Sequence, residues 1–463
     1  MSPEIVGFSI LLVAIFLVVG KLIRLKFKIF SKFFLPSSII AGIIMLLLGP
    51  EVAGRLLDIE GGLFTNDIIS VLSTIPGLLI SVIFASLFIG KKIPNIKKIW
   101  KVSGPQVSFG QTVAWGQYVF GILITILILA PLFNISPMAG ALIEIAFEGG
   151  HGTSAGLADT FADLGFEKGA DLAMGLATVG VISGVIFGVV LINWGVRKNK
   201  TNYLKNPKDF DESQLRGVVD QEERKSGGNL STTTESIEPL ALHLGIIGIA
   251  VLIGYGLLQL LILIESITWG SSGNIVIMEY IPLFPLAMIG GVITQIFIDK
   301  FDKYKLIERG MINRVQGLAL DFLIVSAIAT LSLQVIGSNI EVFLILALTG
   351  IIWNIMAFLF LAPKMIPKNW FERGIGDFGQ SMGMTAAGLM LIRIVDSKQD
   401  TRAMEAFGYK QLLFEPFVGG GIMTAMSVPL IYNFGAIPIL LISGLIMIGW
   451  MMTGIFYFGK KGA

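Results

Sequence analysis

Apolar runs of about 20 residues recur along most of this 463-residue sequence and constrain its fold more than any other feature. Such a run is typical of a helix that crosses a bilayer, because a span needs about 20 residues at a rise of about 1.5 Å each. Charged residues make up 14% of the chain, against roughly 25% in soluble domains. The sequence therefore predicts an all-α polytopic membrane protein with eleven spans. They are expected at residues 5–23, 33–50, 69–90, 109–133, 171–195, 240–264, 281–298, 316–335, 341–362, 411–433 and 435–458.

The overall charge and residue usage exclude several classes of protein. The formal net charge is +2, which gives no reason to expect a nucleic-acid partner. There is no cysteine, so disulfides, thiolate metal sites and cysteine nucleophiles are excluded. The sequence has no GxxxxGK[ST] motif that would bind ATP. No cofactor is predicted beyond a coupling ion.

The distribution of Lys and Arg predicts the topology, because connections on the cytoplasmic side retain these residues. Of the 34 Lys and Arg residues, 31 fall in alternate connections and the C-terminal tail. The opposite side holds only Arg55 and Lys168, and Arg393 lies inside an apolar stretch. Eleven spans then place the N-terminus outside and the C-terminus in the cytoplasm. The first apolar run is expected to be a permanent span, since no base precedes it and no cleavage site follows.

Two apolar segments do not fit as ordinary spans, namely residues 137–157 and 374–395. Both are interrupted by glycines, and counting either as a crossing would put positive connections on both sides of the membrane. We expect re-entrant hairpins, whose non-helical backbone must be satisfied by protein or by a water-filled cavity.

The two halves of the sequence also resemble each other. The residues TSAGL at 153–157 match TAAGL at 385–389, and each half is predicted to hold five spans with a hairpin before the fifth. An odd number of spans turns the second copy upside down, which is the inverted repeat typical of secondary transporters. The predicted domains are an N-terminal repeat at 1–196, a cytoplasmic linker at 197–238, an inverted C-terminal repeat at 239–434, and an extra transmembrane helix with a tail at 435–463.

The strongest local signal is EGGHGTS at residues 148–154 in the first hairpin. Glycines let backbone amides or carbonyls approach a ligand closely, and unwound carbonyls suit a hard cation such as Na⁺. A packing surface of small residues is the alternative. The predicted substrate-binding residues here are Gly149, Gly150, His151, Gly152, Thr153 and Ser154, and Gly150 is also a predicted Na⁺ ligand.

The second hairpin carries the matching element, with the same packing alternative. Its predicted substrate-binding residues are Gly379, Gln380, Ser381, Gly383 and Thr385, of which Ser381 and Thr385 are also predicted Na⁺ ligands. Asp321 and Arg393 lie in apolar runs, where a buried charge is costly and so a functional candidate. Asp321 is assigned to Na⁺ or a proton, with a structural ion pair as the alternative. Arg393 is assigned to a substrate carboxylate, with snorkelling to the surface as the alternative.

The GGHGT hairpin, the glycine-rich hairpin that ends in Thr385, and the span from Phe414 to Pro429 resemble the bacterial sodium:glutamate symporter family over about residues 5 to 433. The resemblance implies Na⁺-coupled symport of glutamate or a related small anion by alternating access. It also implies a homodimer in the inner membrane of a bacterium, with the hairpin residues named above at the site. Ser381 departs from the glycine usual in the second loop, which leaves glutamate itself open.

Two other functions stay open on the residues alone. One is a proton- or Na⁺-coupled transporter of hydroxycarboxylates or dicarboxylates. The other belongs to a different class, because Gly374-Ile375-Gly376-Asp377 matches the GxGD pattern of intramembrane aspartyl proteases. Those enzymes need a second aspartate to share a proton, usually after a tyrosine, and no tyrosine here precedes an aspartate. A symmetric channel fits two unequal hairpins poorly.

Overall fold

The structure is a computed structural model, and it describes residues 2–27, 30, 35–91, 96–202, 218, 222, 226–233, 235–269, 277–383, 385–396 and 401–462. These residues form helices and connections without a β-strand, as predicted. Most of the predicted linker at 197–238 lies outside the described residues, so its conformation stays a prediction.

The chain divides into two compact units that cut across its two halves. Unit 1 comprises Met1–Ile93, Ala155–Leu157 and Glu212–Gln334. Unit 2 comprises Pro94–Ser154, Ala158–Asp211 and Val335–Ala463. Each half thus contributes its first three spans to unit 1 and its later spans with a glycine-rich segment to unit 2. The inversion of one half relative to the other stays a prediction.

Ten helical stretches of the described residues are long and apolar enough to cross a membrane, one fewer than predicted. The prediction of a continuous span at 411–433 is wrong. This range falls on two helices, α21 (Ala403–Phe414) and α22 (Ile422–Phe434). Gly419 and Gly420 lie between them with φ of 70° and 96°. These left-handed conformations suit glycine and cannot continue a right-handed helix.

Unit 1 is a bundle of long apolar helices. Its spanning helices are α1 (Pro3–Lys26), α3 (Ser37–Leu48) with its continuation through α4 (Arg55–Leu57), α5 (Asn66–Ser86), α13 (Pro239–Ile267), α14 (Leu283–Phe301) and α15 (Arg309–Ala329). Side chains at several N-termini accept from the first free backbone N–H groups, as Thr65 does from Ile68 N in α5. The helices begin where such caps stand.

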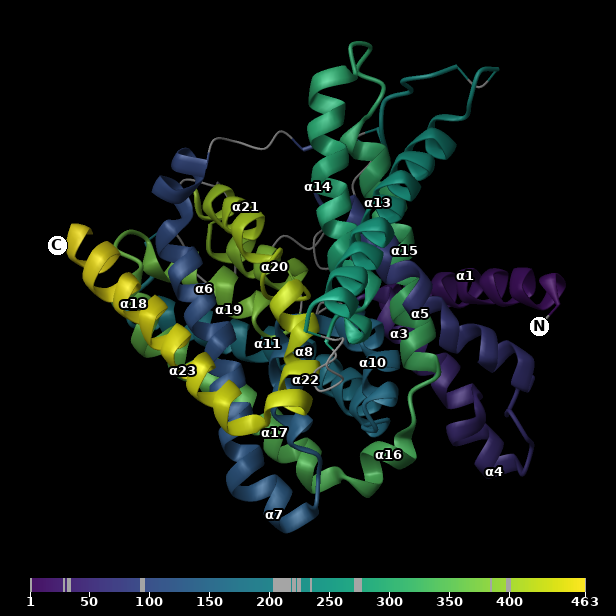
Figure 1. The fold of residues 1–463 in the computed structure, drawn as a ribbon, viewed down its shortest axis with the longest axis horizontal. Coiled ribbons are helices and arrows are strands. Elements are labelled where there is room, and N and C mark those ends of the chain that lie inside the picture. The colour runs from purple at the N-terminus through teal and green to yellow at the C-terminus, as the bar shows by residue number, and fades with distance from the viewer. Residues whose placement is uncertain are drawn as a thin grey trace. The chain divides into compact units, whose positions relative to one another are not determined.

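Small residues bring neighbouring helices of unit 1 close together. A Cβ on Gly290 of α14 would lie 2.1 Å from the carbonyl oxygen of Ala250 in α13, and these two helices run side by side (Figure 1). A Cβ on Gly291 would lie 2.1 Å from the carbonyl oxygen of Ala85 in α5. This is the close backbone approach by which small residues join helices in membranes.

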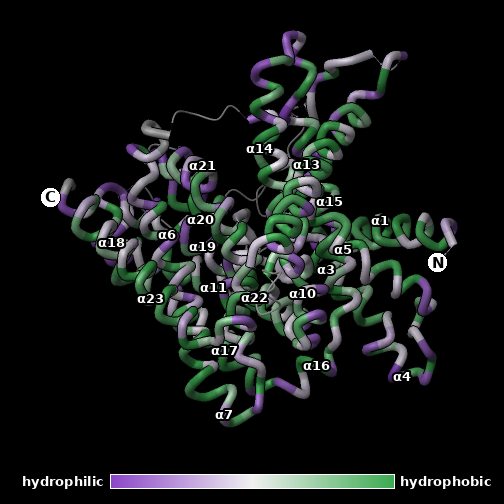
Figure 2. Tube along the Cα trace, in the orientation of Figure 1, coloured by the Kyte–Doolittle hydropathy of each residue, from purple (hydrophilic) through white to green (hydrophobic). Residues whose placement is uncertain are grey.

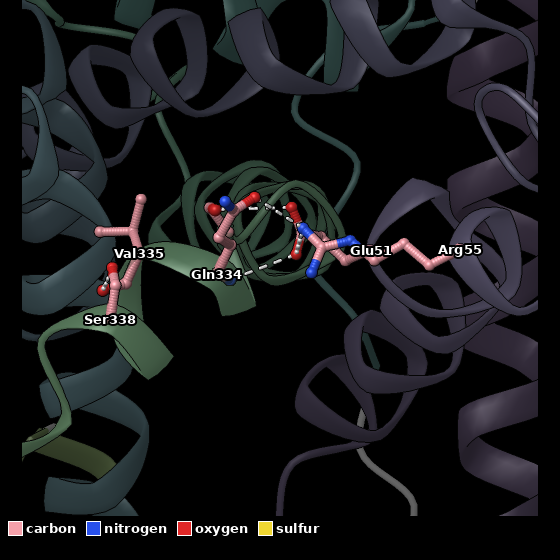
Figure 3. Close-up of polar contacts among 6 residues, drawn as sticks. Glu51, Arg55, Gln334, Val335 and Ser338 are labelled. Atoms are coloured by element: carbon pink, nitrogen blue, oxygen red, sulfur yellow. Dashed lines mark hydrogen bonds and ion pairs between the residues drawn. The ribbon is translucent and has the colours of Figure 1, made fainter.

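A polar contact at the surface of unit 1 joins segments far apart in sequence. Arg55 Nη2 lies 3.0 Å from a Glu51 carboxylate oxygen and donates to Gln334 Oε1 at 3.0 Å (Figure 3). The backbone N–H of Gln334 donates to the same Glu51 carboxylate at 3.3 Å. The Arg55 side chain is 52% exposed, so this cluster is a surface feature.

Unit 2 combines long helices with short, interrupted ones. Its long stretches are α6 (Ile96–Ile124) with α7 (Ala130–Phe133), α11 (Lys168–Arg197), α17 (Ile340–Met356) with α18 (Ala362–Met365), and α23 (Ala436–Met452). Its other short helices are α8 (Leu142–Phe147), α9 (Gly150–Gly156, whose last residues group with unit 1), α10 (Ala158–Asp163), α19 (Trp370–Gln380) and α20 (Thr385–Val395). Hydrophobic residues predominate along α23, which packs against α6 (Figure 2).

Candidate functional site

The first glycine-rich segment is a break between two short helices. Its tip, residues 148–150, joins α8 to α9 and is called the first tip below. Gly150 has φ of 70°, a backbone conformation that residues other than glycine rarely adopt. The backbone N–H groups of Glu148 and Gly149 both donate to Glu144 O, at 2.9 and 3.1 Å, and so end α8. The sequence EGG therefore folds as a helix end and a sharp turn.

The second segment repeats this arrangement. Its tip, residues 381–383, follows the end of α19 and precedes α20, and is called the second tip. Gly383 has φ of 135°, and its N–H donates to Gln380 O at 3.0 Å. Both glycine-rich segments are thus breaks between helices. That each enters and leaves the membrane on one side stays a prediction.

The two tips meet inside unit 2. A Cβ on Gly150 would lie 2.4 Å from the carbonyl oxygen of Gly383, a distance that only glycine permits. The Ser381 hydroxyl donates a short hydrogen bond to Glu148 Oε1. Gly180 of α11 faces the same junction, since a Cβ there would lie 2.6 Å from the carbonyl oxygen of Met382. The structure therefore brings together two segments that are 233 residues apart.

Further side chains fix the second tip through its backbone. The Ser381 carbonyl oxygen accepts from Gln117 Nε2 of α6 at 2.9 Å and from Asn354 Nδ2 of α17 at 2.6 Å. Gln117 Nε2 also donates to Asn354 Oδ1 at 3.0 Å. All three residues are buried, and buried polar networks of this kind hold one geometry because each broken bond is costly.

Glu144 lies one turn before the first tip and is held by neutral donors. The Tyr118 hydroxyl donates to Glu144 Oε2. The Thr424 hydroxyl and the N–H of Gly419 donate to Oε1, at 2.8 and 3.1 Å. Glu144 is 0% exposed, so these bonds replace its lost hydration. The break between α21 and α22 supplies one of the three donors, Gly419, and the first turn of α22 supplies another, Thr424.

Lys410 of α21 is a buried ammonium beside the second glycine-rich segment. Its Nζ lies 3.4 Å from Asp377 Oδ1 and donates to Gln380 Oε1 at 2.8 Å. It also lies 3.8 Å from the ring centre of Phe414, within range of a cation–π interaction. A Cβ on Gly110 of α6 would lie 2.5 Å from Lys410 Cε, so this glycine leaves room for the lysine. The counts of Lys and Arg include Lys410 in the connection at 396–410, whereas the structure places it in α21 with a side chain that is 0% exposed.

Hydroxyl groups near the tips have different surroundings. Thr153 Oγ1 and Ser154 Oγ of α9 are buried and have no hydrogen-bond partner among the described residues. His151 Nε2 lies 3.0 Å from Thr178 Oγ1 of α11. Thr385 Oγ1 accepts from Gln411 Nε2 at 3.2 Å. A buried hydroxyl without a hydrogen-bond partner lowers the stability of the folded protein, so these two hydroxyls are available to bind a ligand.

The predicted site residues fall into two groups. Those of the two glycine-rich segments lie at or next to the tips, and all of them belong to unit 2. Arg393 is in the last turn of α20 with an exposed side chain, so the structure does not bring it to the tips. Asp321 lies on α15 of unit 1, also exposed. Substrate and Na⁺ binding by these residues stay predictions.

Among the buried charged residues, four lie near the tips and were assigned no role in binding substrate or cation from the sequence, namely Glu144, Glu148, Asp377 and Lys410. Glu144 and Glu148 carried a signal, because they stand four residues apart in an otherwise apolar run and so share one helix face. Asp377 entered only through the GxGD pattern. The structure pairs Asp377 with an ammonium, whereas a protease dyad needs two carboxyls that share a proton. Within the described part of the chain, no three His, Cys, Asp or Glu side chains gather as a metal site.

Comparison with known proteins agrees with this picture. The sequence model of the family described as Sodium/glutamate symporter matches residues 6–398. A protein named sodium/glutamate symporter from Haemophilus influenzae is 22% identical over 446 residues, which cover 93% of this chain and 98% of that protein. One of the same name from Escherichia coli is 23% identical over 317 residues, which cover 67% of this chain and 71% of that protein.

Proposed function

We propose, from the premise that this chain belongs to the sodium/glutamate symporter family, that its two tips form the site where glutamate or a closely related small organic anion is carried together with Na⁺. The single observation that carries this proposal is the meeting of the tips, with Gly150 against the Gly383 carbonyl and Glu148 bonded to Ser381. Unwound backbone and hydroxyls at such a junction are the groups with which transporters bind ions and anions.

The proposed division of roles follows from the chemistry of the groups. The unpartnered Thr153 hydroxyl, the Thr385 hydroxyl and backbone N–H groups at the tips donate to substrate carboxylates. Carbonyl oxygens at Gly150 and hydroxyls of Ser381 and Thr385 are oxygen ligands of the kind that Na⁺ takes. Alternating access then moves this site between the two faces of the membrane.

Uptake by proteoliposomes tests the coupling. Labelled glutamate should accumulate when an inward Na⁺ gradient is imposed at constant pH, and not when choline replaces Na⁺. A panel of unlabelled amino acids and hydroxy acids as competitors identifies the substrate. Accumulation driven by a proton gradient alone would contradict Na⁺ coupling, and stronger competition by a hydroxycarboxylate would favour the alternative substrate class.

We also propose the orientation that the Lys and Arg counts predict, with the N-terminus outside, the C-terminus in the cytoplasm and residues 197–238 on the cytoplasmic side. Protease should cut this segment in inverted membrane vesicles and leave it intact in right-side-out vesicles. The inverse pattern would contradict the inverted repeat as well.

The proposed assembly is a homodimer in the bacterial inner membrane. Chemical cross-linking of the protein in native membranes, followed by denaturing gels, should trap a species of twice the monomer mass. A monomer alone at all cross-linker concentrations would contradict the dimer.

A further inference from the structure

Three buried carboxylates lie near the tips, and their surroundings differ in a way that bears on cation binding. Glu148 interacts electrostatically with both of the others, Glu144 and Asp377, and with Lys410. If all three carboxyls are ionised, they and one ammonium leave an excess of negative charge in a dry interior, which is costly unless a proton or a bound cation neutralises it. Hydrogen bonds alone do not single out one carboxylate, because both oxygens of Asp377 and Oε2 of Glu148 lack a hydrogen-bond partner among the described residues. The ion pair of Asp377 with Lys410 separates Asp377 from Glu148.

Glu144 is fully satisfied by the protein itself. The Tyr118 hydroxyl binds one of its oxygens, and the Thr424 hydroxyl and the N–H of Gly419 bind the other. Three donors on one carboxylate stabilise its charge without a metal ion. Each oxygen of Glu144 therefore has at least one donor within the protein.

Asp377 has a permanent counter-charge. Lys410 Nζ stands 3.4 Å from its Oδ1, and Gln380 Oε1 and the Phe414 ring hold that ammonium in place. Both members of the pair are 0% exposed. The glycine at position 110 leaves space for the lysine, so the pair is built into the packing.

Glu148 differs from both. Its Oε1 accepts from the Ser381 hydroxyl, whereas its Oε2 is buried and has no hydrogen-bond partner among the described residues. The residue is 5% exposed and no lysine or arginine forms an ion pair with it in the described part of the chain. Gln117 Oε1 is likewise buried without a partner, and Gln117 Nε2 already contacts the Ser381 carbonyl.

We propose that Glu148 is a direct ligand of the coupling Na⁺ at the junction of the two tips, and that Lys410 serves as the fixed counter-charge of Asp377. This assignment rests on the proposed function and names the carboxylate that the ion uses. Neutral oxygens such as that of Gln117 complete the shell. One carboxylate with neutral oxygens suits a monovalent hard cation, because the ion and the carboxylate then cancel.

Thermal unfolding of the purified full-length protein tests the assignment. Apparent melting temperatures are measured in detergent without glutamate, while NaCl replaces choline chloride at constant ionic strength. Na⁺ should stabilise the wild type with a saturating concentration dependence. Glu148→Gln should need at least about tenfold more Na⁺ for half of this effect, because it loses the charged ligand. In choline its melting temperature should equal or exceed that of the wild type, since an uncompensated charge is gone.

Glu265→Gln is the matched control, because Glu265 is a buried glutamate of unit 1 whose partners among the described residues are backbone and tryptophan N–H groups. Its Na⁺ dependence should match that of the wild type. If Glu148→Gln does not fold, Glu148→Asp keeps the charge and draws the carboxylate back by one methylene, and a Na⁺ requirement raised at least about threefold would support the assignment.

Opposite results would overturn the proposal in distinguishable ways. A Glu148→Gln protein, or failing that a Glu148→Asp protein, whose half-saturating Na⁺ concentration is within twofold of the wild type removes Glu148 from the ion site and leaves Na⁺ coupling intact. Glu148→Gln that loses a proton dependence of uptake and keeps its Na⁺ dependence also overturns it. A wild type that Na⁺ does not stabilise, and that takes up glutamate in choline, overturns the proposed coupling itself.

Discussion

The two units each contain an ion pair, and the two pairs stand in opposite environments. In unit 1, Arg55 and Glu51 are 3.0 Å apart with the arginine side chain 52% exposed (Figure 3). In unit 2, Lys410 and Asp377 are 3.4 Å apart and both 0% exposed. An exposed pair gains little because water and salt screen it, whereas a buried pair is strongly interdependent. Unit 1 thus keeps this ion pair at its surface, whereas unit 2 keeps one in its interior.

The same contrast holds for buried glutamates. Glu265 of unit 1 accepts from the backbone N–H groups of Ile277 and Met278, both at 2.9 Å, and so ties a nearby segment to the end of α13. Glu144 of unit 2 accepts from Tyr118 and from Thr424, which is 280 residues away. Local caps stabilise helix ends, whereas long-range networks hold a site in one geometry.

Breaking the buried pair should have the largest effect on stability. Lys410→Ala leaves Asp377 charged and unpaired, which we expect to lower the free energy of unfolding by about 3 to 5 kcal/mol. Arg55→Ala should change it by only about 0 to 1 kcal/mol. Apparent melting temperatures in detergent measure both. The double variant Asp377→Asn with Lys410→Met should recover most of the loss, and equal losses from Lys410→Ala and Arg55→Ala would erase the contrast between the units.

Removal of an unpartnered hydroxyl should affect affinity and leave stability unchanged. Thr153→Val deletes a buried hydroxyl that binds nothing in the described protein, so the melting temperature without substrate should not fall. Glutamate affinity should fall ten- to hundredfold, or about 1.5 to 3 kcal/mol, if that hydroxyl binds a carboxylate. Thr74→Val on α5 of unit 1 is the control and should leave affinity unchanged. Unchanged affinity in both variants would remove Thr153 from the site.

Loss of one donor to Glu144 should destabilise unit 2 more moderately. Tyr118→Phe leaves Glu144 Oε2 without its hydroxyl, for an expected cost of about 1 to 3 kcal/mol. Tyr255→Phe removes a hydroxyl from a side chain of α13 that is 52% exposed and should be neutral. Thermal unfolding of the two variants side by side gives the comparison. A neutral Tyr118→Phe would mean that Glu144 does not depend on this bond.

The smallest effect is expected at the cap in unit 1. Glu265→Gln turns charge-assisted bonds to backbone N–H groups into neutral ones, which we expect to cost about 1 kcal/mol. Uptake per folded molecule should equal that of the wild type. A selective loss of uptake would show that unit 1 takes part in transport through this residue.

The sequence predicted the parts of the fold that depend on local pattern. Ten of eleven spans could be read from apolar runs, because crossing a bilayer requires length and hydrophobicity within one segment. The break in 411–433 was missed although Gly419 and Gly420 stand inside it, since glycine is also common within membrane helices. Only the contacts around these glycines, such as that of the Gly419 N–H with Glu144, distinguish a break from a helix.

The candidate site could be predicted only in its backbone. The glycine-rich segments were recognised because glycine, which has no Cβ, permits backbone turns that other residues rarely make. The burial of Lys410 was not predicted, because a lysine is buried only when a partner such as Asp377 compensates its charge. Contacts between side chains of different helices, such as that of Lys410 with Asp377, depend on the tertiary structure and leave no local pattern in the sequence.

The glycine opposite Lys410 limits the order in which this region can change by mutation. A methyl group at position 110 would lie 2.5 Å from Lys410 Cε and 2.8 Å from its Nζ, so it must displace the ammonium. Alanine at 110 is therefore harmful while the lysine is present and less harmful once a shorter residue has replaced it, when Phe414 Cε2 at 3.2 Å is the remaining close neighbour. The reverse step, in which lysine enters at 410, requires glycine at 110 beforehand. The two positions form an epistatic pair, in which one substitution must precede the other along any path of single mutations.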